Sequence, residues 1–382
     1  MPVKVLIVDD SVFFRNRISQ ILRADSRVKV VGTAKNGAEA VTLAEQLQPD
    51  VVTMDVEMPQ MNGIEALKLI MQRSPCQVLM LSSLTRRSAT TTLEALECGA
   101  ADYMEKDART WVADADKVGT MMVDKVIMLG RKQQQLSRRN TIERSMLQRQ
   151  SDTVSSLVAN RAEIRSSEQQ RRLRNNSVAP EAASRRDNPD SVRIPANRIL
   201  AIGASTGGPA ALQAILPQLP ASLPMPVLLI QHMPKTFTSV FAKRLNEQCQ
   251  ITVKEAEDGD RLLPGHAYLA PGGLQMVIDP AAENRIKVIA GDDRITYRPS
   301  VDLTLASLAK VYGNKVLAVI LTGMGSDGCD GARLLKNAGS SVWAQDKSSC
   351  TIFGMPKAVI TANLADNIFS LDDIGKLFQR GR

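Results

Sequence analysis

The chain has 382 residues, more than one ordinary hydrophobic core accommodates, and this length fits two domains with a connector. Hydrophobic residues make up 44% of the sequence, and no apolar run approaches the ~20 residues that cross a bilayer. The first residues show no basic, apolar and small-residue regions of a secretory signal. The sequence therefore predicts a cytoplasmic protein without direct membrane insertion.

Charge and cysteine content argue against two further classes of function. The net charge is +8, but residues 131–193 hold fourteen Lys or Arg against seven Asp or Glu, which leaves the rest of the chain close to neutral. This distribution argues against a nucleic-acid-binding face on either domain. The five cysteines are scattered without a CxxC pair, so we expect reduced structural thiols rather than zinc ligands or disulfides.

Short apolar runs alternate with amphipathic stretches from residue 3 to residue 130. Strict alternation of strands and helices with short loops predicts a parallel sheet covered on both faces. We therefore expect a doubly wound, flavodoxin-like α/β domain over residues 1–125. The expected strands are Val3–Val8, Val28–Gly32, Val51–Asp55, Val78–Ser82 and Ala101–Glu105, and the expected helices are Phe13–Ala24, Ala38–Leu47, Gly63–Gln72 and Ala89–Cys98.

Residues 126–192 form a polar, arginine-rich linker. Between residues 131 and 192, Gln, Arg, Ser and Asn dominate and aromatic residues are absent. Sparse apolar positions are compatible with a polar helix in 131–174 that extends the last helix of the first domain. A solvated tether without fixed structure is the alternative, and the sequence leaves both open.

The α/β alternation returns over residues 193–382 and predicts a second parallel-sheet domain. Buried parallel strands are expected at Arg198–Ile202, Val227–Gln231, Val316–Leu321 and Ser341–Gln345. A β-rich stretch with Gly-containing turns lies between the second and third of these strands, over residues 251–290.

Polar residues follow four strands of the first domain. Asp9 and Asp10 end the first strand and Asp55 ends the third, and these ends share one edge of a parallel sheet. Three carboxylates there suit Mg²⁺, with Asp55 placed to attack a phosphoryl group. Ser82, which ends the fourth strand, and Lys106, which follows the fifth, are suited to hold phosphoryl oxygens. Ordinary loop acids are the alternative, but five polar residues at four strand ends argue against it.

The segments VLIVDDS, TMDVEMPQMNG, LMLSSLT and YMEKD resemble the receiver domain of two-component response regulators. The resemblance implies that Asp55 is phosphorylated by a histidine kinase. It also implies that Asp9, Asp10, Asp55 and the backbone carbonyl of Glu57 bind Mg²⁺, and that Ser82 and Lys106 sense the phosphoryl group. The family usually has Pro after that lysine, whereas this chain has Asp107, so the loop and the switch are expected to differ there.

A second chemical motif, Gly203-Ala-Ser205-Thr-Gly207-Gly208, lies between a predicted strand and a predicted helix. A G-x-S-x-G string in this setting exposes a nucleophilic serine on a sharp turn, where helix amides favour an oxyanion. A glycine-rich turn before a helix also cradles phosphate groups. The motif alone leaves both interpretations open.

The candidate base and its carboxylate favour the nucleophile. The chain has two histidines: His232 ends a predicted strand beside Ser205, whereas His266 lies in a turn, where a structural role is the better interpretation. Asp327 follows the strand Val316–Leu321 in a glycine-rich loop. We expect Asp327 to accept the Nδ1 proton of His232, completing a Ser–His–Asp triad in an order that excludes the ordinary α/β-hydrolases.

The segments IGASTGGP, LLIQHMP, VKEAEDGDRLLPGHAYLAPGG, RPSVDLTLASLA, ILTGMGSDG and FGMPKAVI resemble the catalytic domain of chemotaxis protein-glutamate methylesterases, the CheB family. The resemblance implies a serine hydrolase with the triad Ser205, His232 and Asp327. It implies an oxyanion hole from Thr206 and the Met324 amide, and no cofactor in this domain.

In that family the substrates are methyl-accepting chemoreceptors, on which glutamate methyl esters are hydrolysed with release of methanol and particular glutamines are deamidated. The family also implies that the unphosphorylated receiver covers the esterase cleft. Ser82 and Tyr103 are then expected to belong to the switching element.

Two rival functions make different predictions. A DNA-binding regulator would carry a basic helical output domain, whereas the second domain here is α/β and nearly neutral. A degenerate hydrolase acting as a scaffold would lack part of the triad, and all three residues are present. The sequence does not distinguish flagellar chemotaxis from a parallel chemosensory pathway.

Overall fold

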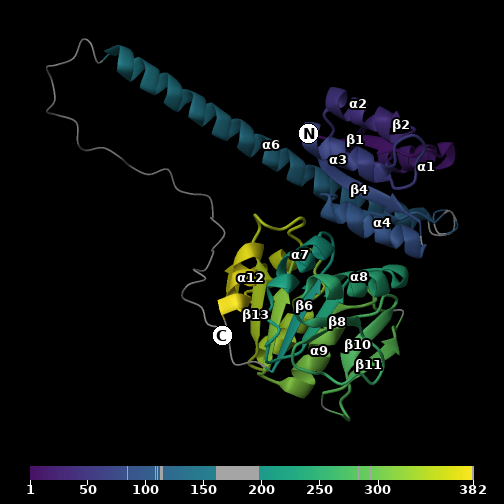
Figure 1. Cartoon of the computed structure of the whole chain (residues 1–382), viewed down its shortest axis with the longest axis vertical. Helices are drawn as coiled ribbons and strands as arrows, with labels where there is room; N and C mark the ends of the chain where they lie inside the picture. Colours follow the sequence, from purple (N-terminus) through teal and green to yellow (C-terminus); the bar gives the residue numbers. More distant parts are fainter. Residues whose placement is uncertain are drawn as a thin grey trace.

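The structure is a computed structural model that describes residues 1–160 and 198–380, apart from Leu84, Ala108, Thr110, residues 112–114, Glu283 and Asp293. For Arg86, Arg87, residues 139–160 and Arg380 it describes the backbone. Two α/β units lie against each other, and one long helix extends past the first (Figure 1). Within the described residues, no helix combines the length and the apolar character needed to cross a membrane.

The first unit is a five-stranded sheet in the order β2-β1-β3-β4-β5, with every pair parallel. This is the flavodoxin-like order, and it confirms the predicted doubly wound fold. Apolar residues of α1 and α6 pack on one face of the sheet, and those of α2, α3 and α4 pack on the other. The strands are β1 Val3–Val8, β2 Val28–Ala34, β3 Val51–Asp55, β4 Gln77–Ser82 and β5 Asp102–Glu105, and the first four helices are α1 Val12–Arg23, α2 Gly37–Leu47, α3 Gly63–Arg73 and α4 Arg86–Glu97.

Helix α6 (Ala115–Asn160) leaves the first unit and crosses the expected boundary between residues 125 and 126. Its first turns bury apolar side chains such as Met122 and Val126 against the sheet. A Cβ at Gly130 would lie 2.1 Å from a methyl group of Val3, so glycine permits this close packing. Of the two alternatives that the sequence left open beyond residue 131, the polar helix is present to Asn160, and residues 161–192 lie outside the described residues.

The second unit is a seven-stranded parallel sheet in the order β14-β13-β12-β6-β7-β9-β8. Helices α7, α8 and α12 cover one face, and α9, α10 and α11 cover the other. The strands are β6 Ile199–Ala204, β7 Val227–Gln231, β8 Thr252–Glu255, β9 His266–Leu269, β12 Val316–Ile320, β13 Ser341–Gln345 and β14 Asn367–Phe369, and the helices are α7 Gly208–Ile215, α8 Lys235–Gln248, α9 Val301–Tyr312, α10 Cys329–Asn337, α11 Met355–Thr361 and α12 Leu371–Arg380.

The β-rich stretch over residues 251–290 divides between two sheets. Strands β8 and β9 extend the main sheet beyond β7 in parallel. Only β10 (Leu274–Ile278) and β11 (Ile286–Ala290) form a separate antiparallel hairpin. The sequence predicted the β content but not the extension of the main sheet by β9 and the edge strand β8, because four-residue strands carry too little periodicity to show which sheet they join.

The two units share an apolar interface. Helix α4 lies beside α7 and α8 (Figure 1), and the apolar core on that side is continuous between the units. The rings of Tyr103 and Phe237 stack across it, with centroids 4.7 Å apart. Beside this stack, Glu97 of α4 accepts hydrogen bonds from Arg244, Gln213 and Gln248.

Candidate active site

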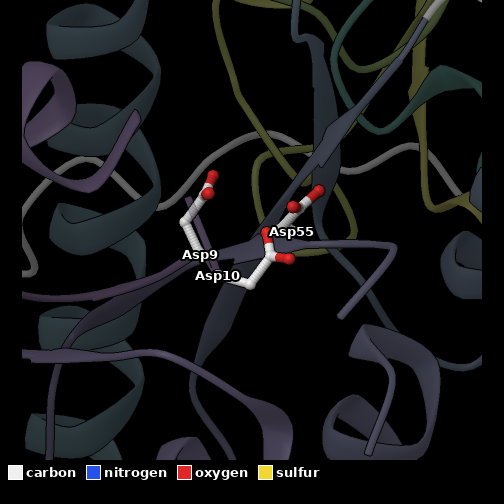
Figure 2. Close-up of side chains that lie close together, drawn as sticks. All are labelled: Asp9, Asp10 and Asp55. Carbon is white, nitrogen blue, oxygen red and sulfur yellow. The ribbon is translucent and has the colours of Figure 1, made fainter. Parts of the chain in front are cut away.

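The three acidic residues predicted from the strand ends converge at one edge of the first sheet (Figure 2). Carboxylate oxygens of Asp9, Asp10 and Asp55 lie within 4.8 Å of one another. Asp9 and Asp55 are buried, whereas Asp10 is exposed and opens the cluster to solvent. The cluster is therefore a set of hard oxygen donors with one open side, as a Mg²⁺ site requires.

The electrostatics of the cluster also fit a divalent cation. Burial raises the pKa of Asp55 from 3.8 to about 6, against the opposing effect of Lys106, and burial likewise raises the pKa of Asp9. Lys106 Nζ lies 2.5 Å from Asp55 and 2.8 Å from Asp9. One ammonium thus faces two buried carboxylates with a third nearby, so the cluster retains an excess of negative charge that a cation would neutralise.

The remaining predicted receiver residues lie around this cluster. Ser82 is fully buried, and its hydroxyl accepts a 2.7 Å hydrogen bond from Thr92 of α4. Glu57 is exposed two residues after Asp55. Asp107, which stands where the sequence analysis expects a proline in the family, accepts a hydrogen bond from the amide of Arg109. Ser82 is directed toward α4, whereas Lys106 contacts the acidic cluster directly.

Ser205 follows β6 in the second unit, on the turn that leads into α7. Gly207 has a φ of 76°, which accounts for glycine at this position. The loop after β12 approaches closely from the other side, because a Cβ at Gly323 would lie 2.9 Å from the Cβ of Ser205. The turn therefore presents the serine between two neighbouring strands.

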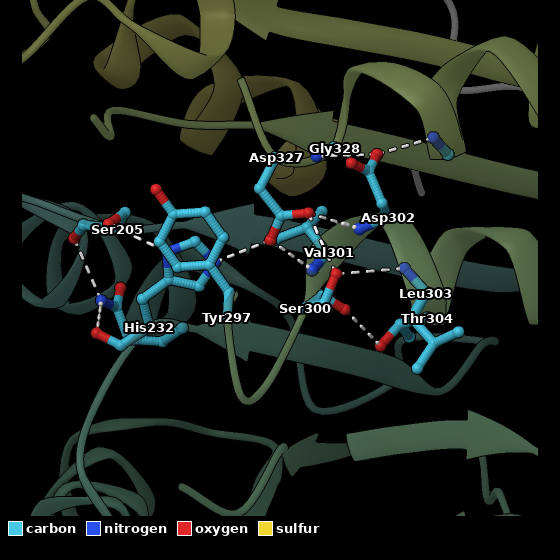
Figure 3. A network of polar contacts seen from close by, with 12 residues as sticks. Ser205, His232, Tyr297, Ser300, Val301, Asp302, Leu303, Thr304, Asp327 and Gly328 are labelled. Atoms are coloured by element: carbon cyan, nitrogen blue, oxygen red, sulfur yellow. Dashed lines mark hydrogen bonds and ion pairs between the residues drawn. The ribbon is translucent and has the colours of Figure 1, made fainter. Parts of the chain in front are cut away.

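The structure brings Ser205, His232 and Asp327 into one hydrogen-bonded row (Figure 3). His232 Nδ1 lies 3.1 Å from Ser205 Oγ, and His232 Nε2 lies 2.8 Å from Asp327 Oδ2. With the Nε2 proton donated to the carboxylate, Nδ1 presents a lone pair to the serine hydroxyl. This geometry favours a nucleophile over a phosphate loop, because it allows the imidazole to remove the serine proton.

The two imidazole nitrogens have the opposite partners to those expected from sequence, where Asp327 was assigned to Nδ1. Strand order explains this correction, since β6 lies between β7 and β12. The amide of His232 donates to Ala204 O at 3.1 Å, which holds the ring beside the end of β6. The nitrogen nearer the backbone, Nδ1, therefore faces Ser205, and the outer nitrogen, Nε2, reaches Asp327 in the loop that follows β12.

Asp327 is kept ionised by its donors. Burial works to raise the pKa of this carboxyl, but the hydrogen bond and charge of His232 and the amides of Asp302 and Val301 lower it to about 2. The neighbouring Asp302 behaves in the opposite way, because burial and the charge of Asp327 raise its pKa to about 6. The environment thus selects Asp327 as the anion that faces the imidazole.

Two contacts of the site were not predicted. The ring of Tyr297 stacks on His232 at 4.2 Å between centroids and 9° between planes. The buried Gln231 side chain donates to the carbonyls of Ser205 and His232, both at 3.0 Å. The position of Gln231 directly before His232 is a signal from which its contact with the site could have been predicted. Tyr297 is distant from His232 in the sequence, and only the fold brings the two rings together.

A cavity of about 950 Å³ lies above the row and is lined by both units. Ser205, His232, Thr206 and Met324 line it from the second unit. From the first unit Lys125 of α6 enters, donating to the Thr206 hydroxyl at 3.2 Å and to Asp102. Thr206 and Met324, the residues expected at an oxyanion hole, therefore line the same cavity as Ser205, and Thr206 contacts the first unit through Lys125.

His266 lies away from this site. Its ring Nδ1 lies 3.0 Å from the carbonyl oxygen of Pro264 within the same turn, and the residue does not line the cavity. The geometry agrees with the structural role expected for His266.

Comparison with known proteins gives matches to both units. Residues 200–378 match the family described as CheB methylesterase, and residues 5–111 match the response regulator receiver domain. The protein-glutamate methylesterase/protein-glutamine glutaminase of group 1 operon from Pseudomonas putida is 50% identical over 378 residues, with 98% of each chain covered. Protein-glutamate methylesterase/protein-glutamine glutaminase 1 from Pseudomonas aeruginosa is 50% identical over 376 residues, again with 98% of each chain covered.

Solved structures match each unit separately. The CheB methylesterase catalytic domain of Thermotoga maritima is 44% identical, with a TM-score of 0.46, and the match covers 48% of this chain and 98% of that one. The response regulator domain of Thermotoga maritima CheB is also 44% identical, with a TM-score of 0.32, and the match covers 34% of this chain and 98% of that one.

Proposed function

The chain belongs to the CheB methylesterase family, and from this premise we propose that it is a phosphorylation-regulated protein-glutamate methylesterase and protein-glutamine glutaminase. Its substrates are methyl-accepting chemoreceptors, and its product supports chemosensory adaptation. We propose three parts: a receiver domain over residues 1–125, a linker over 126–192 and a catalytic domain over 193–382. The hydrogen-bonded row of Ser205, His232 and Asp327 carries the proposal.

In the proposed reaction, His232 Nδ1 takes the proton of Ser205 as Oγ attacks the γ-carbonyl of a glutamate methyl ester. Asp327 holds the ring and stabilises the imidazolium that forms. Thr206 and the Met324 amide stabilise the oxyanion. Methanol leaves with the proton from the imidazolium, and a water molecule then hydrolyses the acyl-enzyme with His232 as base. A glutamine side chain follows the same steps and releases ammonia.

The receiver supplies the proposed input. Asp55 accepts a phosphoryl group from a histidine kinase, and Mg²⁺ would be held by Asp9, Asp10, Asp55 and the carbonyl of Glu57. The cation would neutralise charge on the phosphoryl oxygens. We propose that Lys106 and Ser82 contact the phosphoryl group, and that α4 and Tyr103 change position in response. We propose that this releases the interface between the two domains.

Three interdomain contacts support regulation by occlusion. Lys125 reaches Thr206 beside the nucleophile, Tyr103 stacks on Phe237, and Glu97 binds Arg244. Helix α6 and strand β5 together line the cavity over Ser205. A polypeptide substrate would have to displace this face of the receiver before its glutamate reached the serine.

The test is methanol release from methylated receptor membranes, and the two histidines provide a matched pair. Ser205→Ala and His232→Ala should reduce release to the background rate, whereas His266→Ala should retain the activity of the unmodified protein. Methanol release by Ser205→Ala at the rate of the unmodified protein would exclude Ser205 as the nucleophile, and release at the background rate by both would leave a scaffold role. Loss of activity in His266→Ala alone would show that His266, and not His232, is the base.

A further inference from the structure

A second carboxylate, that of Asp302, lies behind the proposed triad. We propose that Asp302 is a positioning residue for the esterase reaction: it fixes the segment that carries Asp327 and so fixes the orientation of the imidazole. This inference rests on the proposed function, because it concerns the same Ser–His–Asp row. It assigns Asp302 no contact with the substrate or the reacting atoms.

The start of helix α9 holds the carboxylate of Asp327 (Figure 3). The Ser300 hydroxyl donates to Asp327 Oδ1 at 3.1 Å, the Val301 amide donates to Oδ2 at 2.7 Å, and the Asp302 amide donates to Oδ1 at 2.9 Å. These are N-terminal donors of a helix, which favour an anion through both hydrogen bonding and the helix dipole. Asp327 therefore takes its position from α9 although it lies just before α10.

Helix α10 depends on α9 in return. It begins after Gly328, which has a φ of 97° and no side chain with which to cap the helix. The amides of Gly328 and Gly331 instead donate to Asp302 Oδ1, at 2.9 and 2.7 Å. Helix α9 does not need this carboxylate for its own cap, because Ser300 already accepts from the Leu303 amide. The Asp302 side chain thus caps the neighbouring helix.

The two sets of bonds cross between the helices and enclose the catalytic carboxylate. The start of α9 donates to Asp327, and the start of α10 donates to Asp302. Gly328, whose amide donates to Asp302, directly follows Asp327 in the chain. The helices are in close contact here, since a Cβ at Gly331 would lie 2.7 Å from the Cβ of Leu305. Removing the Asp302 acceptor would leave two buried helix amides without a partner and free the start of α10 to shift.

Such a shift would lower the rate of the chemical step more than it would weaken substrate binding. Asp327 Oδ2 lies 2.8 Å from His232 Nε2, and this bond orients the nitrogen that faces Ser205. Misplacement of a catalytic group by about 1 Å costs about 100-fold in rate, whereas residues that do not touch substrate leave its binding largely unchanged.

Two substitutions separate geometry from charge. Asp302→Asn keeps an oxygen that accepts from Gly328 and Gly331 but removes the charge, whereas Asp302→Ala removes the acceptor. Asp330→Ala is the matched control, because Asp330 is an exposed acid in the first turn of α10, the helix that Asp302 caps. Each full-length variant is assayed for kcat and KM by methanol release from methylated receptor membranes, with its melting temperature measured in parallel.

We expect Asp302→Ala to lower kcat about 10- to 100-fold with KM within about threefold, and Asp302→Asn to restore kcat to within about threefold of the unmodified protein. Asp330→Ala should match the unmodified protein. If Asp302→Ala does not fold, Asp302→Ser is measured by the same criterion. A kcat within twofold in Asp302→Ala, a rise in KM that accounts for the loss, or an equal loss in Asp330→Ala overturns the inference. Methanol release that depends on Ser205 would still stand in each case, so the two proposals fail separately.

Discussion

Glu97→Ala tests the proposed occlusion at its most specific polar contact. The Glu97 carboxylate accepts hydrogen bonds from Arg244, Gln213 and Gln248 of the catalytic domain. The bond and charge of Arg244 lower the pKa of Glu97, so the carboxylate is ionised at neutral pH. Because Glu97 lies outside the Ser–His–Asp row, its removal should alter the interface without altering the chemistry.

The expected size of the effect follows from the exposure of the pair. The Arg244 and Glu97 side chains are 23% and 32% exposed, so solvent screens their attraction and the pair contributes about 1 kcal/mol. The two glutamine bonds add roughly 0.5 kcal/mol each. A loss of about 1–2 kcal/mol from the closed arrangement raises the open fraction, and hence the unphosphorylated rate, roughly 5- to 30-fold. The phosphorylated rate sets the upper limit.

The assay compares receptor demethylation by the full chain with and without Mg²⁺ and a small-molecule phosphodonor. Glu45→Ala is the matched control, since it removes a surface ion pair with Arg73 inside the receiver. Glu97→Ala should raise the rate without the phosphodonor and should reduce the further gain on phosphorylation. An unchanged basal rate, together with a normal response to phosphorylation, would show that α4 does not hold the closed arrangement.

Three further predictions follow from the two sites. Asp327→Asn should lower kcat by about 10³- to 10⁴-fold, since the amide no longer fixes the imidazole tautomer, and steady-state methanol release measures this. Tyr297→Ala should lower kcat roughly 2- to 10-fold by removing the ring stacked on His232, whereas Tyr297→Phe should be near normal; equal losses in both would implicate the hydroxyl instead. The raised pKa of Asp55 means that the folded chain keeps a proton that the unfolded chain releases between pH 3.8 and about 6, so stability falls as pH rises through that range. Mg²⁺ should therefore raise the melting temperature more at about pH 7.5 than at about pH 5, and a shift that is equal at both pH values or persists in Asp10→Ala would contradict the assignment.

Sequence reasoning succeeded where periodicity and strand ends carried the information. Buried parallel strands are continuous apolar runs, so β1, β3, β7 and β13 have the predicted bounds. The carboxyl ends of such strands share an edge of the sheet, which is why Asp9 and Asp55 meet, and why Ser205 and His232 meet. These predictions needed the order of elements along the chain and little else.

The contacts that were missed depend on surfaces that meet only after folding. Glu97 and Arg244 lie 147 residues apart in the chain, on two different helices, so neither stands out in the sequence. Asp302 reads as an ordinary acid in the first turn of a helix, where the dipole alone would favour it. Its bonds to α10 become visible only when the packing of α9 on α10 is known.

Strand order also determines how the triad is assembled. Because β6 is paired on one side with β7 and on the other with β12, the nucleophile occupies the middle strand and its two partners arrive from opposite sides. The imidazole must then extend past Ser205 to reach Asp327, which assigns its inner nitrogen to the serine and its outer nitrogen to the carboxylate. Apart from His232, the donors that hold this carboxylate come from the start of α9, and the Asp302 side chain at that start holds α10 in turn.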